Sequence, residues 1–425
     1  MNIHPNEFLA LLQKHSITEG YFLQENEQLQ ASHKALQNFA KDLETWADYQ
    51  NHEGIFFEVD SASNSLFTAF VHNTVRGQAC GGVRLQSYET VEALFQDGLR
   101  LAKGMADKNA IARLWWGGGK GIICRENIHD LSKEERQNMF KKYGLFLSKL
   151  NGVYVTAEDM NVKPDDLADV FATCRYATCI PEVYGGSANP SIFTAKGVFS
   201  GIKAAAAFKY GTTEPLKGKK VLLQGAGNVG CHVLEQLIEA GAKVFVFDVN
   251  KRTLEGLKRN FTSEQVEVVA VLNDFWKIEA DILSPNAIGA ILNDQTIADL
   301  KVGIIAGGAN NQLLDSDKHG KVLHEKGIIY LPDFFINRLG IINCANEQYG
   351  YVRSDIEREV ELVYTDSLDL LQKAKEQDCS PQVIAAQIAA ERMKEPHPIW
   401  GHRGPKLVAE VLKSGFGKIQ EIEMS

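Results

Sequence analysis

The chain has 425 residues, of which 44% are hydrophobic and 23% are charged, and its formal charge is −9. This length is enough for two packed domains, and without a long basic or acidic block the charge argues against a nucleic-acid groove or a membrane-binding face. We therefore expect no nucleic-acid partner and no membrane partner.

The cysteine count and the start of the chain narrow the class further. Seven cysteines, an odd number with no C-x-x-C pair, argue against a disulfide framework and against a structural zinc site, so we expect reduced thiols and no metal. The first twenty residues hold only a short apolar segment, which fits neither a signal peptide nor a spanning helix. The expected location is the cytoplasm.

The first third of the chain alternates between helical and strand patterns. Residues 30–48 carry apolar side chains at helical spacing, and residues 53–73 then predict two strands joined by a polar turn. A long helix is predicted over 89–108 and another over 133–150, where Ser132 and Glu135 have the spacing of a capping box.

A glycine run follows the first of these long helices. The stretch LWWGGGKGII, Leu114 to Ile123, places Lys120 directly after three glycines, more than a strand needs. After the second helix, VYVTAED predicts a buried strand that ends on two carboxylates, the kind of position where α/β proteins keep functional groups. Taken singly, Lys120 would be a surface residue of a loop, and Asp159 would be a helix cap.

The second half of the chain opens with a dinucleotide-binding pattern. A predicted strand at 220–224 runs into the turn Gly225-Ala226-Gly227-Asn228-Val229-Gly230, and a helix and a second strand ending at Asp248 follow. The first glycine makes the turn, the second lets the backbone approach the pyrophosphate, and the third lets helix and strand pack. Asp248 would bind the ribose hydroxyls and repel a 2′-phosphate, which favours NAD, although Lys251 and Arg252 lie nearby.

Further strand-like segments continue the alternation and predict a doubly wound parallel sheet. They are EVVAV, ADILSPNAIGAI, VGIIAGGANNQL and GIIYLPDFFINRLG. The last seventy or so residues are charged amphipathic helices that could pack back on the first domain.

Six blocks of this sequence resemble the glutamate/leucine/phenylalanine/valine dehydrogenase family in order and spacing, and they are most similar to its leucine-dehydrogenase branch. The resemblance covers about residues 50–350. The blocks are ACGGVRLQSYET, GMADKNAIARLWWGGGKGII, TAEDMN, GAGNVG, AGGANNQL and PDFFINRLGIIN.

This resemblance implies a fold and an activity. The expected fold class is α/β with two domains: a substrate-binding and oligomerisation domain from residues 1–188 and 351–425, and a Rossmann NAD-binding domain from residues 189–350. The family's members begin near the predicted strand pair, so residues 1–45 are expected to be an extra helical extension. The implied reaction converts an L-amino acid, NAD and water to a 2-oxo acid, ammonium and NADH, in a homo-oligomer.

The resemblance also assigns roles residue by residue. Lys120 would activate the water that attacks the imino acid, Asp159 would exchange protons with the amine, and Lys108 would bind the substrate carboxylate. A lysine is a base near neutral pH only if desolvation or a second cation lowers its pKa, and the two lysines together could provide both. The remaining matches are backbone contacts from Gly81 and Gly82 to the substrate, and Asn310 and Thr194 near the nicotinamide and the reacting amine.

The matching side-chain pocket indicates which amino acid fits. Family members that use glutamate carry a lysine and a serine where this chain has Cys80 and Cys344, and burying a second carboxylate without a cation would cost several kcal/mol. With Ala157 and Ile341, these positions form an apolar pocket for a branched-chain or aromatic side chain.

Three departures from the family pattern leave alternatives open. Trp116 replaces a leucine, Lys196 replaces an aromatic residue, and Arg338-Leu339 replaces Ala-Gly. Arg338 could bind an anionic side chain if it faces the substrate, or could instead pair with a carboxylate elsewhere. The alternatives are a non-catalytic relative that binds a nucleotide or amino acid as a regulator, a glutamate-type dehydrogenase, and a dehydrogenase whose product feeds a specialised pathway.

Overall fold

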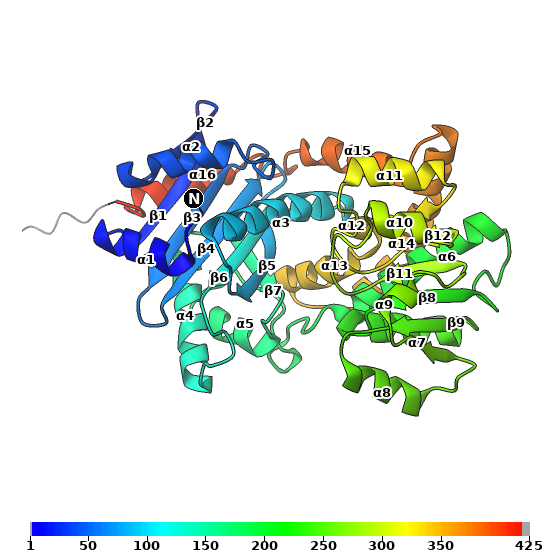
Figure 1. Ribbon diagram of the computed structural model, residues 1–425. Coiled ribbons are helices and arrows are strands. Elements are labelled where there is room, and N and C mark those ends of the chain that lie inside the picture. The colour runs from blue at the N-terminus through cyan, green and yellow to red at the C-terminus, as the bar shows by residue number, and fades with distance from the viewer. Residues whose placement is uncertain (1, 419–425) are drawn as a thin grey trace, which may run out of the picture. The chain divides into compact units, whose positions relative to one another are not determined.

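The computed structural model describes residues 2–418, which divide into two compact units (Figure 1). Unit 1 comprises the described residues up to Asn189, together with Glu347–Tyr351 and the residues from Ala390 onward. Unit 2 comprises Pro190–Asn346 and Val352–Ala389. No helix among residues 2–418 has the length and apolar content needed to cross a membrane. All seven cysteines are free, and five of them are buried.

A seven-stranded mixed sheet forms the centre of unit 1, with strand order β2-β1-β3-β4-β6-β5-β7. Neighbouring strands are antiparallel from β2 as far as the β4/β6 pair, and β6, β5 and β7 are parallel. The strands are β1 (Glu19–Glu25), β2 (Gln28–Ala31), β3 (Gly54–Asp60), β4 (Ser65–Asn73), β5 (Ala79–Gln86), β6 (Gly117–Cys124) and β7 (Tyr154–Glu158).

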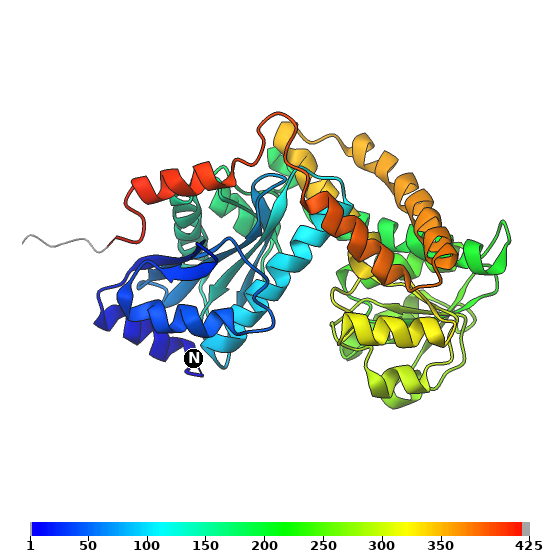
Figure 2. The same cartoon turned by 90° about the horizontal axis from the view of Figure 1, so that it is seen from above.

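Helices cover both faces of this sheet, and the view from above separates the two layers (Figure 2). On one face lie α1 (Pro5–Lys14), α2 (Gln37–Glu44) and α3 (Val91–Ile111), and on the other lie α4 (Lys133–Lys149), α5 (Pro164–Phe171) and α16 (Gly404–Lys413). The predicted strand pair and both predicted long helices are confirmed. The capping box is also present, because the Ser132 side chain accepts from Glu135 N while the Glu135 side chain accepts from Ser132 N.

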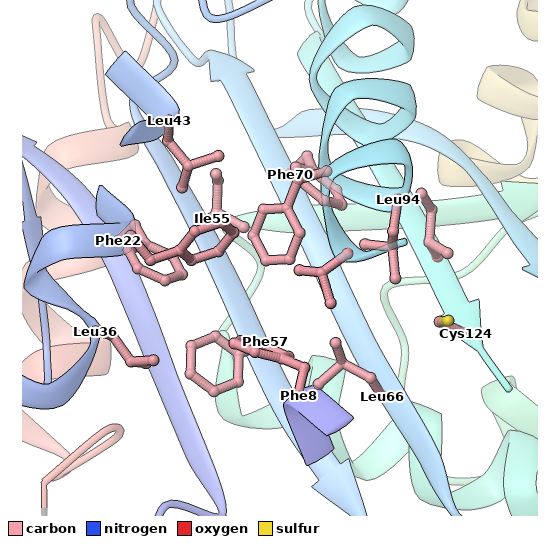
Figure 3. Packing of buried hydrophobic residues seen from close by; sticks show 14 of the residues in the cluster. Phe8, Phe22, Leu36, Leu43, Ile55, Phe57, Leu66, Phe70, Leu94 and Cys124 are labelled. Carbon is pink, nitrogen blue, oxygen red and sulfur yellow. The ribbon is translucent and has the colours of Figure 1, made fainter. Parts of the chain in front are cut away.

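The layer with α1, α2 and α3 is held to the sheet by an aromatic core (Figure 3). Phe39 of α2 and Phe95 of α3 meet edge to face with ring centroids 5.0 Å apart, and Phe22 of β1 packs against both rings. Such edge-to-face pairs stabilise the core beyond the area that they bury. The N-terminal residues are therefore part of the main core of unit 1.

The first 45 residues are not the purely helical extension that we expected. Between α1 and α2 they form β1 and β2, which pair with each other and join the sheet through β3. In the first half of β1, Gly20 and Phe22 are buried while Glu19 and Tyr21 are partly exposed, and this alternation is typical of a strand. Of the helix expected over 30–48, only Gln37–Glu44 is α-helical.

The three glycines before Lys120 lie in a buried strand and not in an exposed loop. Every residue of β6 is buried. A Cβ added to Gly118 would meet the Ala102 carbonyl and the Ala106 side chain of α3, and one added to Gly119 would meet the Tyr154 ring. Glycine is needed here because α3 and the Tyr154 ring of β7 pack directly on the β6 backbone.

Unit 2 is built on a parallel sheet of six strands in the order β10-β9-β8-β11-β12-β13. In chain order this is 3-2-1-4-5-6, the order of a doubly wound dinucleotide-binding fold, so the predicted fold class is confirmed. The strands are β8 (Lys220–Gln224), β9 (Lys243–Phe247), β10 (Val266–Val268), β11 (Ile282–Pro285), β12 (Ile304–Ile305) and β13 (Ile329–Tyr330).

The helices of unit 2 include two long ones, α6 (Ser191–Tyr210) and α14 (Arg353–Glu376), which pack against each other. We expected residues 351–425 in the first domain, but Val352–Ala389 belong to unit 2 because of this packing. The others are α7 (Asn228–Glu239), α8 (Lys251–Asn260), α9 (Leu272–Phe275), α10 (Asp294–Asp299), α11 (Ser316–Glu325), α12 (Asp333–Ile336), α13 (Leu339–Ala345) and α15 (Pro381–Met393), the end of which belongs to unit 1.

The close contact between α3 and β6 predicts opposite effects for two glycine substitutions. Gly118→Ala should lower the free energy of unfolding by about 1–3 kcal/mol, because the new methyl group overlaps the Ala102 carbonyl and Ala106. Gly104→Ala on α3 is the control. Nothing lies within 4 Å of its added Cβ, so it should be neutral or stabilise by up to about 1 kcal/mol. Urea unfolding measures both; equal effects would contradict the packing argument.

Candidate functional site

Lys120 lies in the middle of β6 with only 4% of its surface exposed. Its Nζ is paired with Oδ2 of Asp159, directly after the end of β7. The Asp159 side chain keeps 26% of its surface exposed, so the carboxylate connects the buried ammonium with solvent. The two residues that we expected to act together are therefore in contact.

Arg84 of β5 is a member of this cluster that sequence reasoning missed. Its Nε donates to Asp159 Oδ2 at 3.2 Å, and its Nη1 donates to Asp97 Oδ2 on α3 at 2.9 Å. The Tyr88 hydroxyl donates to the same Asp97 oxygen at 2.6 Å. The available signal was an arginine inside an otherwise buried strand, since a long charged side chain is rarely placed there without a partner.

The cluster shifts the protonation of its two central groups. Burial raises the pKa of the Asp159 carboxyl, but the charges of Lys120 and Arg84 outweigh burial and lower that pKa to about 2. Burial lowers the pKa of the Lys120 ammonium, Asp159 opposes this shift, and Arg84 reinforces it. Asp159 is therefore a carboxylate at every physiological pH, while Lys120 loses its proton more readily than an exposed lysine.

Lys108 is half-buried near the end of α3 and beside Asn109, which fixes this end of the helix to the sheet. The Asn109 amide donates to the Gly117 carbonyl at 2.6 Å and to the Cys80 carbonyl at 3.3 Å. Lys108 is thereby held near the starts of β5 and β6. The sequence analysis did not single out Asn109, although it directly follows Lys108 and its buried amide fixes this end of α3.

Gly81 and Gly82 allow the close packing around the cluster. A Cβ at Gly81 would overlap the Gly119 carbonyl, and a Cβ at Gly82 would lie 2.8 Å from Cβ of Asp159. Ala157 is paired with Gly82 across the two strands. Cys80 is fully buried and Ala157 is 3% exposed, so both lie in the interior of the strands beside the cluster.

Glu158, the other carboxylate of the TAED segment, is partly buried and has few hydrogen-bond donors to stabilise its charge. Its Oε2 is buried and has no hydrogen-bond partner among the described residues, and its Oε1 accepts from Asn189 at 3.4 Å. Burial, Asp159 and Asp166 raise the pKa of Glu158 to about 7. Of the two neighbouring acids, one is thus always ionised and the other titrates near neutrality.

The glycine turn of unit 2 has three glycines with three separate functions. Gly225 has φ +89°, which glycine adopts without strain, and a Cβ at Gly230 would overlap the Gly225 carbonyl, so helix and turn pack closely. No atom lies within 4 Å of a Cβ built on Gly227. Gly227 is the N-cap residue of α7, and no side chain at this cap accepts from the first N–H groups of the helix.

Asp248 stands beside this turn, at the end of β9. Its Oδ2 accepts from Ala226 N and its Oδ1 from Asn250 N, both at 2.7 Å. These bonds fix the carboxylate and leave each oxygen able to accept another hydrogen bond. A dinucleotide fits the open space at Gly227, the start of α7 without a side-chain cap, and this fixed carboxylate.

The other predicted residues of unit 2 lie on α6, on α13 and in the loop after β12. Thr194 Oγ1 donates to the Pro190 carbonyl at 3.0 Å, and Asn310 Oδ1 accepts from the Asn337 amide at 2.9 Å. Ile341 and Cys344 are buried on α13. Cys80 and Ala157 belong to unit 1, so the expected four-residue pocket remains a prediction.

The departures from the family pattern have local partners. Lys196 pairs with Glu357 at 2.7 Å, and buried Arg338 pairs with Asp366 while donating to the Phe335 and Leu362 carbonyls. Trp116 is buried, in line with core packing. Trp115 is 40% exposed, and the Arg76 guanidinium lies 4.3 Å from its ring centre.

Comparison with known proteins identifies the class. Residues 55–176 match the model of the Glu/Leu/Phe/Val dehydrogenase dimerisation domain, and residues 185–250 and 245–397 match that of glutamate/leucine/phenylalanine/valine dehydrogenase. Leucine dehydrogenase of Bacillus cereus is 40% identical over 81% of this chain and 91% of its own length. Phenylalanine dehydrogenase of Lysinibacillus sphaericus is 38% identical over 81% and 89%.

A solved structure agrees with these relatives. L-tryptophan dehydrogenase from Nostoc punctiforme has a TM-score of 0.66 and 33% identity over 84% of this chain and 98% of that one. The fold and the relatives together define an amino-acid dehydrogenase, an oxidoreductase that uses a nicotinamide cofactor. The chain belongs to the Glu/Leu/Phe/Val dehydrogenase family, as the sequence blocks indicated.

The raised pKa of Glu158 predicts a pH-dependent stability change. A carboxyl whose pKa is raised on folding binds its proton more tightly in the folded state, so the stability it contributes is lost as pH rises from 4.5 through about 7. Glu158→Gln should therefore raise the melting temperature by about 2–4 °C at pH 8 and have little effect at pH 4. Thermal unfolding at both pH values measures this; equal changes would refute the assigned cause.

Proposed function

We propose that this protein catalyses the reversible, NAD-dependent oxidative deamination of an L-amino acid with an apolar side chain. The reaction consumes the amino acid, NAD and water, and it yields a 2-oxo acid, ammonium, NADH and a proton. The observation that carries the proposal is the buried Lys120 paired with Asp159, in a chain whose second unit carries an intact dinucleotide turn. A non-catalytic regulator would have no need for that buried ion pair.

The residues of unit 1 supply the acid and base chemistry in this proposal. Lys108 binds the substrate carboxylate. Lys120 in its neutral form accepts a proton from the water that attacks the imino carbon, and its lowered pKa makes this form accessible at moderately alkaline pH. Asp159 stays ionised and exchanges protons with the substrate nitrogen. The backbones of Gly81 and Gly82 contact the substrate.

The glycine turn and Asp248 would hold the cofactor. N–H groups at the start of α7 would bind the pyrophosphate, and Asp248 would accept hydrogen bonds from the ribose hydroxyls. Asn310 and Thr194 would lie near the nicotinamide and the reacting amine. Bound NAD supplies the acceptor of the hydride. NAD is preferred to NADP in this proposal because the Asp248 carboxylate would repel a 2′-phosphate.

The apolar side-chain class is supported by what stands where glutamate enzymes carry polar groups. Cys80 and Cys344 are both buried, and a second substrate carboxylate beside them would lack a cation. Arg338 does not supply that cation, because Asp366 and two carbonyl groups already engage its guanidinium. The relatives named above are leucine, phenylalanine and tryptophan dehydrogenases, which agrees with an apolar substrate.

Assembly into a homo-oligomer is part of the proposal. The family model that matches residues 55–176 is described as a dimerisation domain. Those residues include most of the unit 1 sheet and the whole of α3.

The activity is tested by NADH formation at 340 nm, with purified protein, NAD and each of the twenty L-amino acids at alkaline pH. A branched-chain or aromatic amino acid should be turned over, and Lys120→Ala should lower kcat by about 10³-fold because it removes the base. Lys142→Ala is the control, since that lysine pairs with Asp60 away from the cluster and should retain full activity. Efficient use of glutamate would overturn the side-chain class, and no turnover at all would favour a non-catalytic relative.

Cofactor choice gives a second prediction. Asp248→Asn keeps an acceptor for the backbone N–H groups but removes the negative charge, so the ratio of kcat/KM for NADP to that for NAD should rise about tenfold. Asp315→Asn is the matched control, because Asp315 is another unit 2 carboxylate that accepts from a backbone N–H group, that of Lys318. An unchanged ratio in Asp248→Asn would rule out this carboxylate as the selector.

A further inference from the structure

Two cations share one oxygen of Asp159. Lys120 Nζ and Arg84 Nε both donate to Oδ2, and within residues 2–418 neither cation donates to Oδ1. The Asp159 side chain is partly exposed, whereas Lys120 is not. Oδ1 is therefore the oxygen that can meet a reacting nitrogen, and Oδ2 is the oxygen that holds the carboxylate in place.

Arg84 is itself held on its far side. Its Nη1 donates to Asp97 of α3, and the Tyr88 hydroxyl donates to the same carboxylate oxygen. The guanidinium thus links a carboxylate on the helix with the carboxylate after β7. A planar group with several fixed donors can make this link, whereas a lysine ammonium is a point charge that cannot reproduce both directions.

We propose that Arg84 is a positioning residue of the reaction: it holds Oδ2 of Asp159, directs Oδ1 to the substrate nitrogen, and by its charge favours the neutral form of Lys120. This inference rests on the proposed function. Its electrostatic part is independent of turnover, because Arg84 lowers the pKa of Lys120 whether or not a substrate is bound, although burial is the larger cause.

Other ionisable groups also surround Lys120, and their effects on its protonation have to be distinguished from the effect of Arg84. His72 of β4 is buried, which lowers its pKa to about 3, so it is neutral in the relevant range. Asp159 remains ionised throughout. On the neighbouring elements, the other charged residues are Glu92, Asp97, Arg100, Lys103, Asp107 and Lys108 of α3 and Glu158 of β7, and the other titratable ones are Cys80 of β5 and Tyr154 of β7. A measurement at Lys120 itself is therefore needed beside the kinetics.

The test compares wild type with Arg84→Met and Arg84→Lys. The first readout is kcat/KM between pH 7 and 11 with the preferred amino acid. The second is the pH dependence of Lys120 acetylation by acetic anhydride, quantified by peptide mass spectrometry. Arg136→Met is the matched control, because Arg136 forms a two-bonded pair with buried Asp166 in the same unit but outside the cluster.

In Arg84→Met, the rising limb of kcat/KM and the Lys120 labelling curve should both move to higher pH by about one unit, and kcat should fall about 10–100-fold. Arg84→Lys should return both curves toward the wild-type position without restoring kcat, because it keeps the charge and loses the bridge. Arg136→Met should leave both curves unchanged.

Each contrary result has a defined meaning. If the curves and kcat of Arg84→Met match wild type, the inference is wrong. If Arg84→Met does not fold, Arg84→Lys alone tests the positioning role. A kcat equal to that of wild type would overturn that role. A reduced kcat, with the kcat/KM and Lys120 labelling curves at their wild-type pH, would support it. If wild type turns over no amino acid, the proposed function fails, and the labelling curves alone then decide whether Arg84 acts on Lys120.

Discussion

The ammonium of Lys120 is buried inside a sheet, and a charge in that position is stable only next to an opposite charge. Asp159 provides that charge, and the local structure of unit 1 is what allows the two groups to meet. Gly118 lets α3 pack on β6, and Gly82 lets the chain after β7 come close to β5. The glycines of this region therefore serve the ion pair indirectly, by shortening the distances between backbones.

Features whose determinants are close together in the chain could be predicted from the sequence, whereas features that depend on distant residues could not. Local signals were sufficient for the capping box at Ser132, for the turn from 225 to 230 and for the strand pair at 54–73, because all their determinants lie within a few residues. The pairing of Lys120 with Asp159 could be expected only through the family resemblance. Arg84 was missed because its partners, Asp97 and Asp159, are 13 and 75 residues away, and only the pairing of β5 with β7 and the packing of α3 on β5 bring them together.

Our predictions for the N-terminal residues and for the helices after residue 351 differ from the structure. The reason is again that contacts between distant segments decide these elements. Tyr21, Phe22 and Leu23 form a short apolar run that becomes a strand only because β3 offers a free edge. On α14, the amphipathic pattern predicts that one face is covered but does not identify the partner. Val363 and Leu370 of α14 are buried, and α14 packs against α6, which is a contact between distant segments that periodicity does not encode.

Lys196 and Arg338, two departures from the family pattern that left the activity open, both bind α14. Lys196 pairs with Glu357 and Arg338 pairs with Asp366, and both carboxylates belong to that helix. The two cations thus bind one element of unit 2 at separate points. Their presence is accounted for by the attachment of α14 and does not require an anionic substrate.

The hairpin β1–β2 also determines how sheets of different copies can meet. With β1 bonded along one side of β3 and β4 along the other, β3 has both edges occupied, and the outermost strand on that side is the four-residue β2. A strand this short offers few backbone groups to another chain. Copies of this protein are therefore unable to join their sheets through β3, and any continuous sheet across two subunits would have to begin at a different strand.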